Sequence, residues 1–207
     1  MRVFVLNSGR CGSLGFARAC THISNFTSAH ESRSKDVGPS HFDFPDNHIE
    51  VDNRLSWFLG SLDRVFGDDC VYVHLTRNAE DVAKSHARRF EKTNAIMWSY
   101  MNVIYPGHKP ELQSGELTPM DFARDYVGTV NDNITLFLKD KTRWASVDIE
   151  APEPGFRTMW DMIGAEGDFD AALAEFSARH HRTVKPRRKW WLFKALGRGL
   201  ANPRSIT

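Results

Sequence analysis

Short apolar runs alternate along the chain with longer segments whose apolar residues have the spacing of a helix face. Four of these runs are long enough for a β-strand, and the strands that we predict from them span residues 3–6, 48–51, 70–75 and 144–149. The predicted helices span residues 13–20, about 52–66, 78 onward, 118 onward, 156–163 and 169–180. This alternation predicts an α/β fold with a parallel β-sheet flanked by helices.

Cap residues mark where two of the predicted helices begin, and polar stretches mark the loops. Asn78 and Thr118 are predicted cap residues, and each is followed three positions later by an acidic residue, Asp81 and Asp121. The stretch 23–47 has no clean period and is rich in Ser, His, Pro and Asp, so we expect a long loop with room for one helical turn. A second loop is expected over 106–115. Long loops in compact domains often carry function.

The composition is that of a single globular domain. The chain has 207 residues, of which 41% are hydrophobic and 26% charged, which excludes a disordered, collagen-like or coiled-coil protein. No stretch is apolar enough to span a membrane, and the apolar run at the N-terminus is too short for a signal peptide. Cys11, Cys20 and Cys70 lack the spacing of a zinc site or a disulfide framework, which favours a reducing compartment. We therefore expect a cytoplasmic protein.

Charge is distributed unevenly, although the formal net charge is only +1. Nine of the 27 Lys and Arg residues, and no Asp or Glu, lie after residue 176. We expect an α/β domain over residues 1–184 and a basic, aromatic C-terminal segment over 185–207. The mixture of basic and aromatic residues in 185–198 fits an interfacial segment on an anionic membrane surface. Packing on the domain or closing over a bound nucleotide fits the same residues, whereas nucleic-acid binding has only charge and aromatics in its favour.

The first predicted strand turns into the first predicted helix through residues 8–13, of sequence SGRCGS. Two glycines permit a tight turn that directs backbone N–H groups toward an anion, while Arg10 adds a positive charge and Ser13 a hydroxyl. We interpret the segment as a phosphate-binding loop; a plain turn capped by serine is the alternative. The chain has no Gly-Lys dipeptide and no GxGxxG here, so neither the Walker A nor the dinucleotide motif is present. Cys11 and Arg18 miss the Cys-x5-Arg spacing of cysteine phosphatases by one residue, which argues against a thiolate nucleophile.

A second candidate anion site follows the strand predicted over 70–75. Arg77 lies at the carboxyl end of that strand, and Ser85 lies two turns into the next helix. A guanidinium group and a hydroxyl in these places can bind a second phosphate. Taken alone the pair is a weak signal, because an Arg at a strand end is often a solvated surface residue.

Together the two motifs resemble the sulfotransferase family that uses 3′-phosphoadenosine 5′-phosphosulfate (PAPS). The segment VFVLNSGRCGS, residues 3–13, is similar to the family's first strand and 5′-phosphosulfate loop. The segment VYVHLTRNAEDVAKS, residues 71–85, is similar to its 3′-phosphate motif in order and in Arg-to-Ser spacing. WASVDIE resembles the later strand that carries a Glu near the cofactor in some members, here Glu150. The two main motifs lie within about the first 90 residues.

The resemblance implies a P-loop-like α/β fold and PAPS as the sulfuryl donor, with adenosine 3′,5′-bisphosphate (PAP) as the product. It implies that Arg77 and Ser85 contact the 3′-phosphate, and that the 5′-phosphosulfate is contacted by Gly9, Arg10, Cys11, Gly12, Ser13 and Leu14. Many members have Lys at the position of Arg10. An Arg there can stabilise developing charge but is a poor proton donor. The motifs require no metal ion.

Sulfuryl transfer to a hydroxyl also needs a general base. His30 and Glu31, in the stretch after the first helix, resemble the place where some bacterial and carbohydrate-acting members keep a catalytic Glu, and we predict Glu31 as the base with His30 as the first alternative. His48, Glu50 and Asp52 follow, because cytosolic relatives keep a catalytic His on the next strand. The competing interpretation is that His30 and Glu31 are ordinary loop residues.

The resemblance therefore implies an enzyme that transfers the sulfuryl group of PAPS to a hydroxyl or amine by in-line displacement. A nucleotide or small-molecule kinase with a degenerate P-loop is the first alternative, and a non-catalytic module that binds an anionic partner through the basic tail is the second. The acceptor, a small molecule or a glycan, is not identified by the sequence. Its pocket is expected from loops 23–47 and 90–115, whose aromatics suit a sugar, a phenol or a lipid equally: Phe26, Phe42, Phe44, Trp98, Tyr100 and Tyr105.

Overall fold

Five parallel strands form one sheet in the order β2-β3-β1-β4-β5. The structure is a computed structural model that describes residues 1–93 and 95–177. The basic segment 185–207 and its predicted boundary at residue 184 therefore lie outside the described residues. The strands are β1 (Arg2–Leu6), β2 (Thr27–His30), β3 (His48–Val51), β4 (Val71–Thr76) and β5 (Trp144–Asp148).

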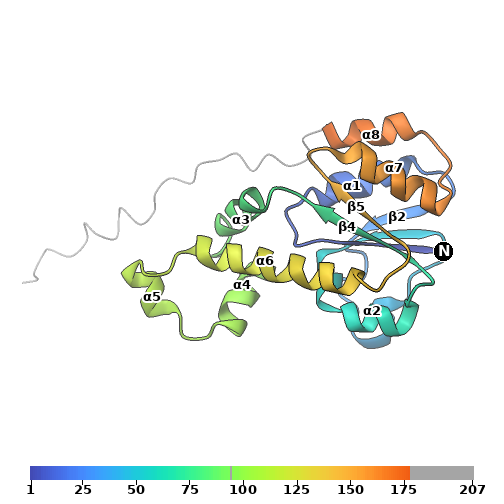
Figure 1. Ribbon diagram of the computed structural model, residues 1–207. Coiled ribbons are helices and arrows are strands. Elements are labelled where there is room, and N and C mark those ends of the chain that lie inside the picture. The colour runs from blue at the N-terminus through green and yellow to red at the C-terminus, as the bar shows by residue number, and fades with distance from the viewer. Residues whose placement is uncertain (94, 178–207) are drawn as a thin grey trace, which may run out of the picture.

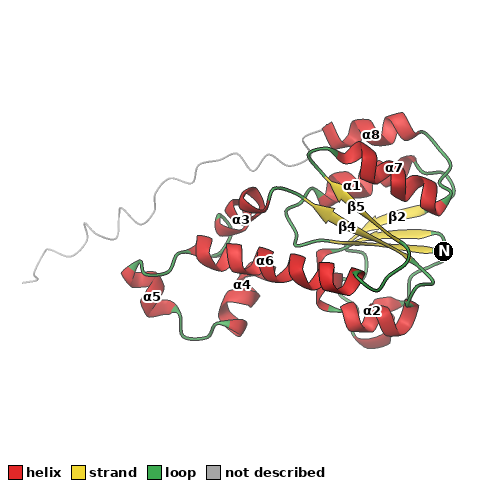
Figure 2. Cartoon of the chain, viewed as in Figure 1, coloured by secondary structure: helices red, strands yellow, loops and turns green. Residues whose placement is uncertain are grey.

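Helices cover both faces of the sheet (Figure 1). On one face lie α1 (Ser13–Ala19), α7 (Pro152–Ile163) and α8 (Phe169–Ser177), and on the other lie α2 (Leu59–Phe66) and the long helix α6 (Pro119–Leu138) (Figure 2). Helix α3 (Ala79–Ala87) packs against α6. The remaining elements are α4 (Ile96–Ser99), the π-helical turn η4 (Tyr100–Ile104), α5 (Lys109–Ser114) and the 3₁₀ turns η1 (Cys20–His22), η2 (Gly38–Phe42) and η3 (Asn53–Trp57). Within the described residues, no helix is long and apolar enough to cross a membrane.

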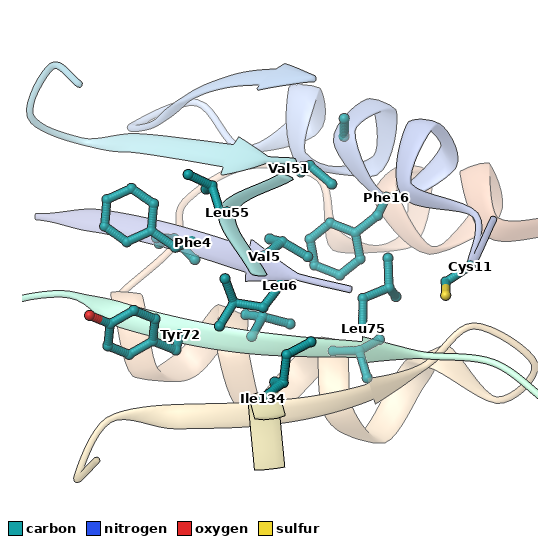
Figure 3. Packing of buried hydrophobic residues seen from close by; sticks show 14 of the residues in the cluster. Phe4, Val5, Leu6, Cys11, Phe16, Val51, Leu55, Tyr72, Leu75 and Ile134 are labelled. Atoms are coloured by element: carbon teal, nitrogen blue, oxygen red, sulfur yellow. The ribbon is translucent and has the colours of Figure 1, made fainter. Parts of the chain in front are cut away.

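The central strand β1 is enclosed by the core. Val3 to Leu6 have no exposed surface, as expected for a parallel strand covered on both faces. Figure 3 shows Phe4 of β1 beside Tyr72 of β4, and Phe16 of α1 on the other face of the sheet. Phe4 also contacts Phe66 of α2, and Phe16 contacts Phe156 of α7. Because β1 pairs in parallel with β3 on one side and with β4 on the other, the carboxyl ends of these three strands lie side by side.

The predicted α/β class is confirmed, and so are the four predicted strands. Three local predictions are wrong. The stretch 23–47 contains the edge strand β2, whose sequence TSAH has no apolar run to reveal it. The predicted helix 52–66 is two elements, η3 and α2, which meet at Phe58. The expected loop 106–115 contains the short helix α5.

Helix boundaries elsewhere follow the capping signals. Thr118 and Asp121 form a reciprocal capping box at the start of α6, and Asn78 accepts a hydrogen bond from the backbone N–H of Asp81 at the start of α3. Helix α7 begins at Pro152, four residues before the predicted start. The last strand ends at Asp148, one residue early. Helix α8 is described as far as Ser177, and the last three residues of its predicted range lie outside the described part.

Candidate functional site

A cavity of about 970 Å³ opens at the carboxyl ends of the strands. Its walls come from the loop after β1, the end of β2, the residues after β3 and β4, and the segment of α4 and η4. This is the edge at which parallel α/β sheets bind ligands. The volume lies at the upper end of the range found for small-molecule sites, about 300 to 1,000 Å³.

The loop after β1 has a backbone that only its glycines adopt without strain. Gly9 and Gly12 have φ values of 76° and 83°, and Arg10 between them has a φ of 61°. The side-chain oxygen of Asn7 accepts a hydrogen bond from the N–H of Gly9 at 2.8 Å. A Cβ on Gly12 would lie 2.8 Å from Cγ1 of Ile149, so the backbone here passes too close to its neighbour for a side chain. Within the described residues no side chain caps the first turn of α1, whose N–H groups follow this loop.

The two predicted anion motifs meet through Arg10. Its Nε donates a hydrogen bond to Oγ of Ser85 at 3.0 Å, and Nη1 of Arg77 lies 3.5 Å from the carbonyl oxygen of Arg10. Nε of Arg77 is 3.8 Å from a carboxylate oxygen of Glu150. Arg10 and Arg77 line the cavity, whereas Ser85 contacts Arg10 and is not among the described residues of the wall. Segments that are far apart in the chain thus form one basic surface.

Cys11 is turned away from this surface. Cys11 is 2% exposed, and its thiol donates to the carbonyl oxygen of Gly9 at 3.2 Å. Burial raises the pKa of Cys11, which keeps the thiol protonated. Among the described residues that line the cavity, its neighbours Gly9, Gly12, Ser13 and Leu14 are present but Cys11 is not. Only the backbone of Cys11 can take part in an anion cradle.

His30 and Glu31 both line the cavity, on the far side of the loop from Arg77. Nε2 of His30 lies 2.9 Å from Oγ of Ser13. Glu31 has a φ of 56°, and its backbone N–H donates to the carbonyl oxygen of Val51 at the end of β3. One of its carboxylate oxygens is 2.8 Å from Nη1 of Arg54. Because a non-glycine residue in this conformation is strained, the positive φ of Glu31 is typical of functional sites.

The other candidate bases lie behind the cavity wall rather than on it. Glu50 is fully buried, accepts hydrogen bonds from N–H and Oγ of Ser32 at 2.8 and 2.5 Å, and lies 3.1 Å from Nε2 of His48. Burial alone would raise the pKa of Glu50, but the hydrogen bonds from His48 and Ser32 outweigh it and lower the pKa below its usual value. Burial raises the pKa of Asp52, whose carboxylate accepts the N–H of Arg54 at 2.7 Å. These three side chains lie on β3 or directly after it, and none is among the described residues that line the cavity.

The cavity also contains basic residues that the sequence did not single out. Arg54, Arg89 and Lys92 line it together with Arg10 and Arg77, against the carboxylates of Glu31 and Glu175. Burial, followed by the charge of Arg89, lowers the pKa of Arg10. An anion bound here would relieve this crowding of like charges. Arg54 had the same signal as Arg77, since it follows the carboxyl end of a predicted strand; Arg89 lies one turn beyond Ser85. The described residues contain no cluster of three or more His, Cys, Asp or Glu that could hold a metal ion.

Comparison with solved structures identifies a similar fold. The chain matches a sulfotransferase domain from the curacin biosynthetic pathway with a TM-score of 0.59 and 14% sequence identity, over 85% of this chain and 77% of that one. No protein-family model and no curated protein matches the sequence. A likeness at this level of identity concerns the fold, and it agrees with the five-stranded parallel sheet and its flanking helices. The chain therefore has an α/β fold of the sulfotransferase type.

Proposed function

We propose that the protein is a sulfotransferase that uses PAPS as donor and releases PAP. The observation that carries the proposal is that Arg10 and Arg77 line one cavity while Arg10 also donates a hydrogen bond to Ser85, which joins the two motifs that resemble the 5′- and 3′-phosphate sites. The fold of the sulfotransferase domain described above supports it.

The residues in the cavity fit such a donor. Gly9 and Gly12 line the cavity, and neither position has room for a side chain, because a Cβ would lie 2.9 Å from Nδ2 of Asn53 at Gly9 and 2.8 Å from Cγ1 of Ile149 at Gly12. Arg10, together with the N–H groups of this loop, would hold the 5′-phosphosulfate, and Arg77 with Ser85 would hold the 3′-phosphate. Arg10 and Arg77 supply positive charge that a bisphosphate compensates. When bound, PAPS supplies the sulfuryl group and a phosphate leaving group.

Removal of the acceptor's proton is assigned to Glu31 or His30, which line the cavity at the end of β2. The acceptor oxygen forms a bond to sulfur while the bond from sulfur to the 5′-phosphate oxygen breaks, and a base takes the acceptor's proton. Glu31 is the proposed base, with Arg54 orienting its carboxylate. His30 is the alternative base and is held by Ser13. Arg10 would stabilise the charge that develops on the leaving phosphate oxygen.

Steady-state transfer from PAPS to a panel of phenols, alcohols and sugars, followed as PAP release, tests this assignment. Glu31→Gln should lower turnover by about 10² to 10⁴ while the Kd for PAP stays close to that of wild type. Glu153→Gln is the matched control, because this carboxylate is exposed on α7 and pairs with Arg157. Wild-type turnover in Glu31→Gln would show that Glu31 is not the base. Binding of ATP with magnesium in place of PAP would favour the kinase alternative.

A further inference from the structure

One wall of the cavity is a stripe of side chains on α4 and η4. Ile96, Ser99, Tyr100, Val103 and Ile104 all line the cavity, and their spacing is that of one helical face. Val103 is 70% exposed and Ile104 is 50% exposed. An apolar helix face normally packs against the core. On this face, Val103 and Ile104 at the C-terminal end are instead exposed to the cavity.

Two further aromatic side chains continue this apolar surface. Trp57 and Phe58, at the junction of η3 and α2, line the same cavity and are 45% and 41% exposed. The ring of Trp57 lies 6.1 Å from the ring of Tyr100, measured between centroids, so the two segments meet. The cavity thus has a basic region around Arg10 and Arg77 and an apolar region formed by Trp57, Phe58, Ile96, Tyr100, Val103 and Ile104.

Contacts with α6 anchor the stripe. The hydroxyls of Tyr100 and Tyr105 both donate to Oδ2 of Asp125, at 2.5 and 2.7 Å. The hydroxyl of Tyr100 is therefore engaged with α6 rather than with a ligand, and it leaves Ser99 as the polar side chain of the stripe. A sugar needs several polar partners for its hydroxyls, because a buried hydroxyl without a partner is costly. The stripe does not supply them.

We infer that the acceptor is an alcohol or phenol with an uncharged, apolar body, which lies on this apolar region while its hydroxyl points to Glu31 and His30. Large exposed apolar surfaces inside a cavity are typical of ligand sites, because covering them removes apolar area from water. The inference rests on the proposed function. It selects, among sugar, phenol and lipid-like acceptors, those that carry apolar surface. The transfer gives a sulfate ester and PAP, and the hydroxyl proton goes to the base.

Calorimetric titration of the full chain with 2-naphthol, with and without saturating PAP, tests the inference. Methyl β-D-glucopyranoside is the polar comparison. Val103→Asp combined with Ile104→Asp should weaken naphthol binding by at least about tenfold, because a charge replaces apolar contact area at both positions. Val65→Asp is the matched control: Val65 is 49% exposed on α2 and lies outside the described cavity wall. Should the double variant not fold, Val103→Asp alone replaces it, since that side chain is the more exposed.

The expected result is that naphthol binds and the glucoside does not, with the loss confined to the stripe variants. Naphthol binding no tighter than the glucoside, or unchanged in the stripe variants, would overturn the inference. Naphthol would also fail to bind if another part of the chain, such as the aromatic C-terminal segment, covered the apolar region, and this outcome would equally overturn the inference. PAP binding is measured in the same experiment. If PAP binds and naphthol does not, only the acceptor class is wrong, whereas naphthol binding without PAP binding would contradict the proposed function.

Discussion

The hydroxyl oxygen of Ser13 lies 2.9 Å from Nε2 of His30. This contact joins the start of α1, immediately after the loop that follows β1, to the end of β2. Because the sheet order places β3 between β2 and β1, the two residues meet above the strand ends and not through neighbouring strands. Under the proposed function, this contact links a candidate base to the loop that would hold the donor.

Ser13→Ala and His30→Gln should be coupled. Each loses the same hydrogen bond, so the double variant should lose less free energy of PAP binding than the sum of the two single variants, by about 0.5 to 1.5 kcal/mol. Calorimetric Kd values for PAP in wild type and the three variants measure this coupling. Strictly additive losses would mean that the contact contributes nothing to donor binding.

Gly12→Ala should destabilise the fold by about 1 to 3 kcal/mol and weaken PAP binding, because the residue has a φ of 83° and the new Cβ would meet Ile149. Urea denaturation gives the free energy of unfolding. Adding Ile149→Ala removes the steric part and should restore some PAP binding. Gly128→Ala is the control: this helical glycine of α6 has open space around it, so the change should be neutral or stabilising by up to about 1 kcal/mol. Equal effects at Gly12 and Gly128 would contradict the close approach.

His86 should make the fold sensitive to mild acid. Burial lowers the pKa of His86 to about 4, and the charge of Arg10 acts in the same direction, although the hydrogen bond from Nε2 to the carbonyl oxygen of Ser8 opposes both. In the unfolded chain a His titrates near pH 6.5, so between about pH 6.5 and 4 the unfolded state binds the extra proton.

The free energy of unfolding should therefore fall as the pH drops through this window, by up to about 1.4 kcal/mol per pH unit from this residue. Urea denaturation of wild type and His86→Gln at several pH values between about 7 and 4.5 measures the difference in slope. His86→Gln should show a shallower dependence. The same slope in both proteins would mean that His86 is not kept neutral by the fold.

The sequence predicted those parts of the site in which several local patterns coincide within a few residues. An apolar strand followed by SGRCGS, and another followed by Arg77, predict two anion-binding loops because strand, turn and helix chemistry agree over a few residues. Strand β2 was not predicted, because its residues TSAH are polar or small and partly exposed at the sheet edge, so no apolar run marks the strand. The position of β2 decides where His30 and Glu31 lie, and the contacts of His30 with Ser13 and of Glu31 with Arg54 could not be derived from the sequence.

Contacts between distant segments depend on strand order, which local patterns do not encode. The hydrogen bond from Arg10 to Ser85 forms because β1 and β4 are neighbours in the sheet. The stripe of Ile96, Val103 and Ile104 has a helical period that is equally typical of a core-facing helix. Only its exposure in the structure identifies it as a cavity wall.

Calorimetric titration with PAP, with ATP plus magnesium as the comparison, tests the central claim most directly. We predict that wild type binds PAP more tightly than ATP and that Arg77→Ala weakens PAP binding by about 10- to 100-fold, the worth of a hydrogen bond to a charged group. Arg124→Ala, which removes an exposed guanidinium paired with Glu80 on the protein surface, should bind PAP like wild type. No PAP binding at millimolar concentration, or equal PAP affinity in wild type and Arg77→Ala, would contradict the proposed donor site.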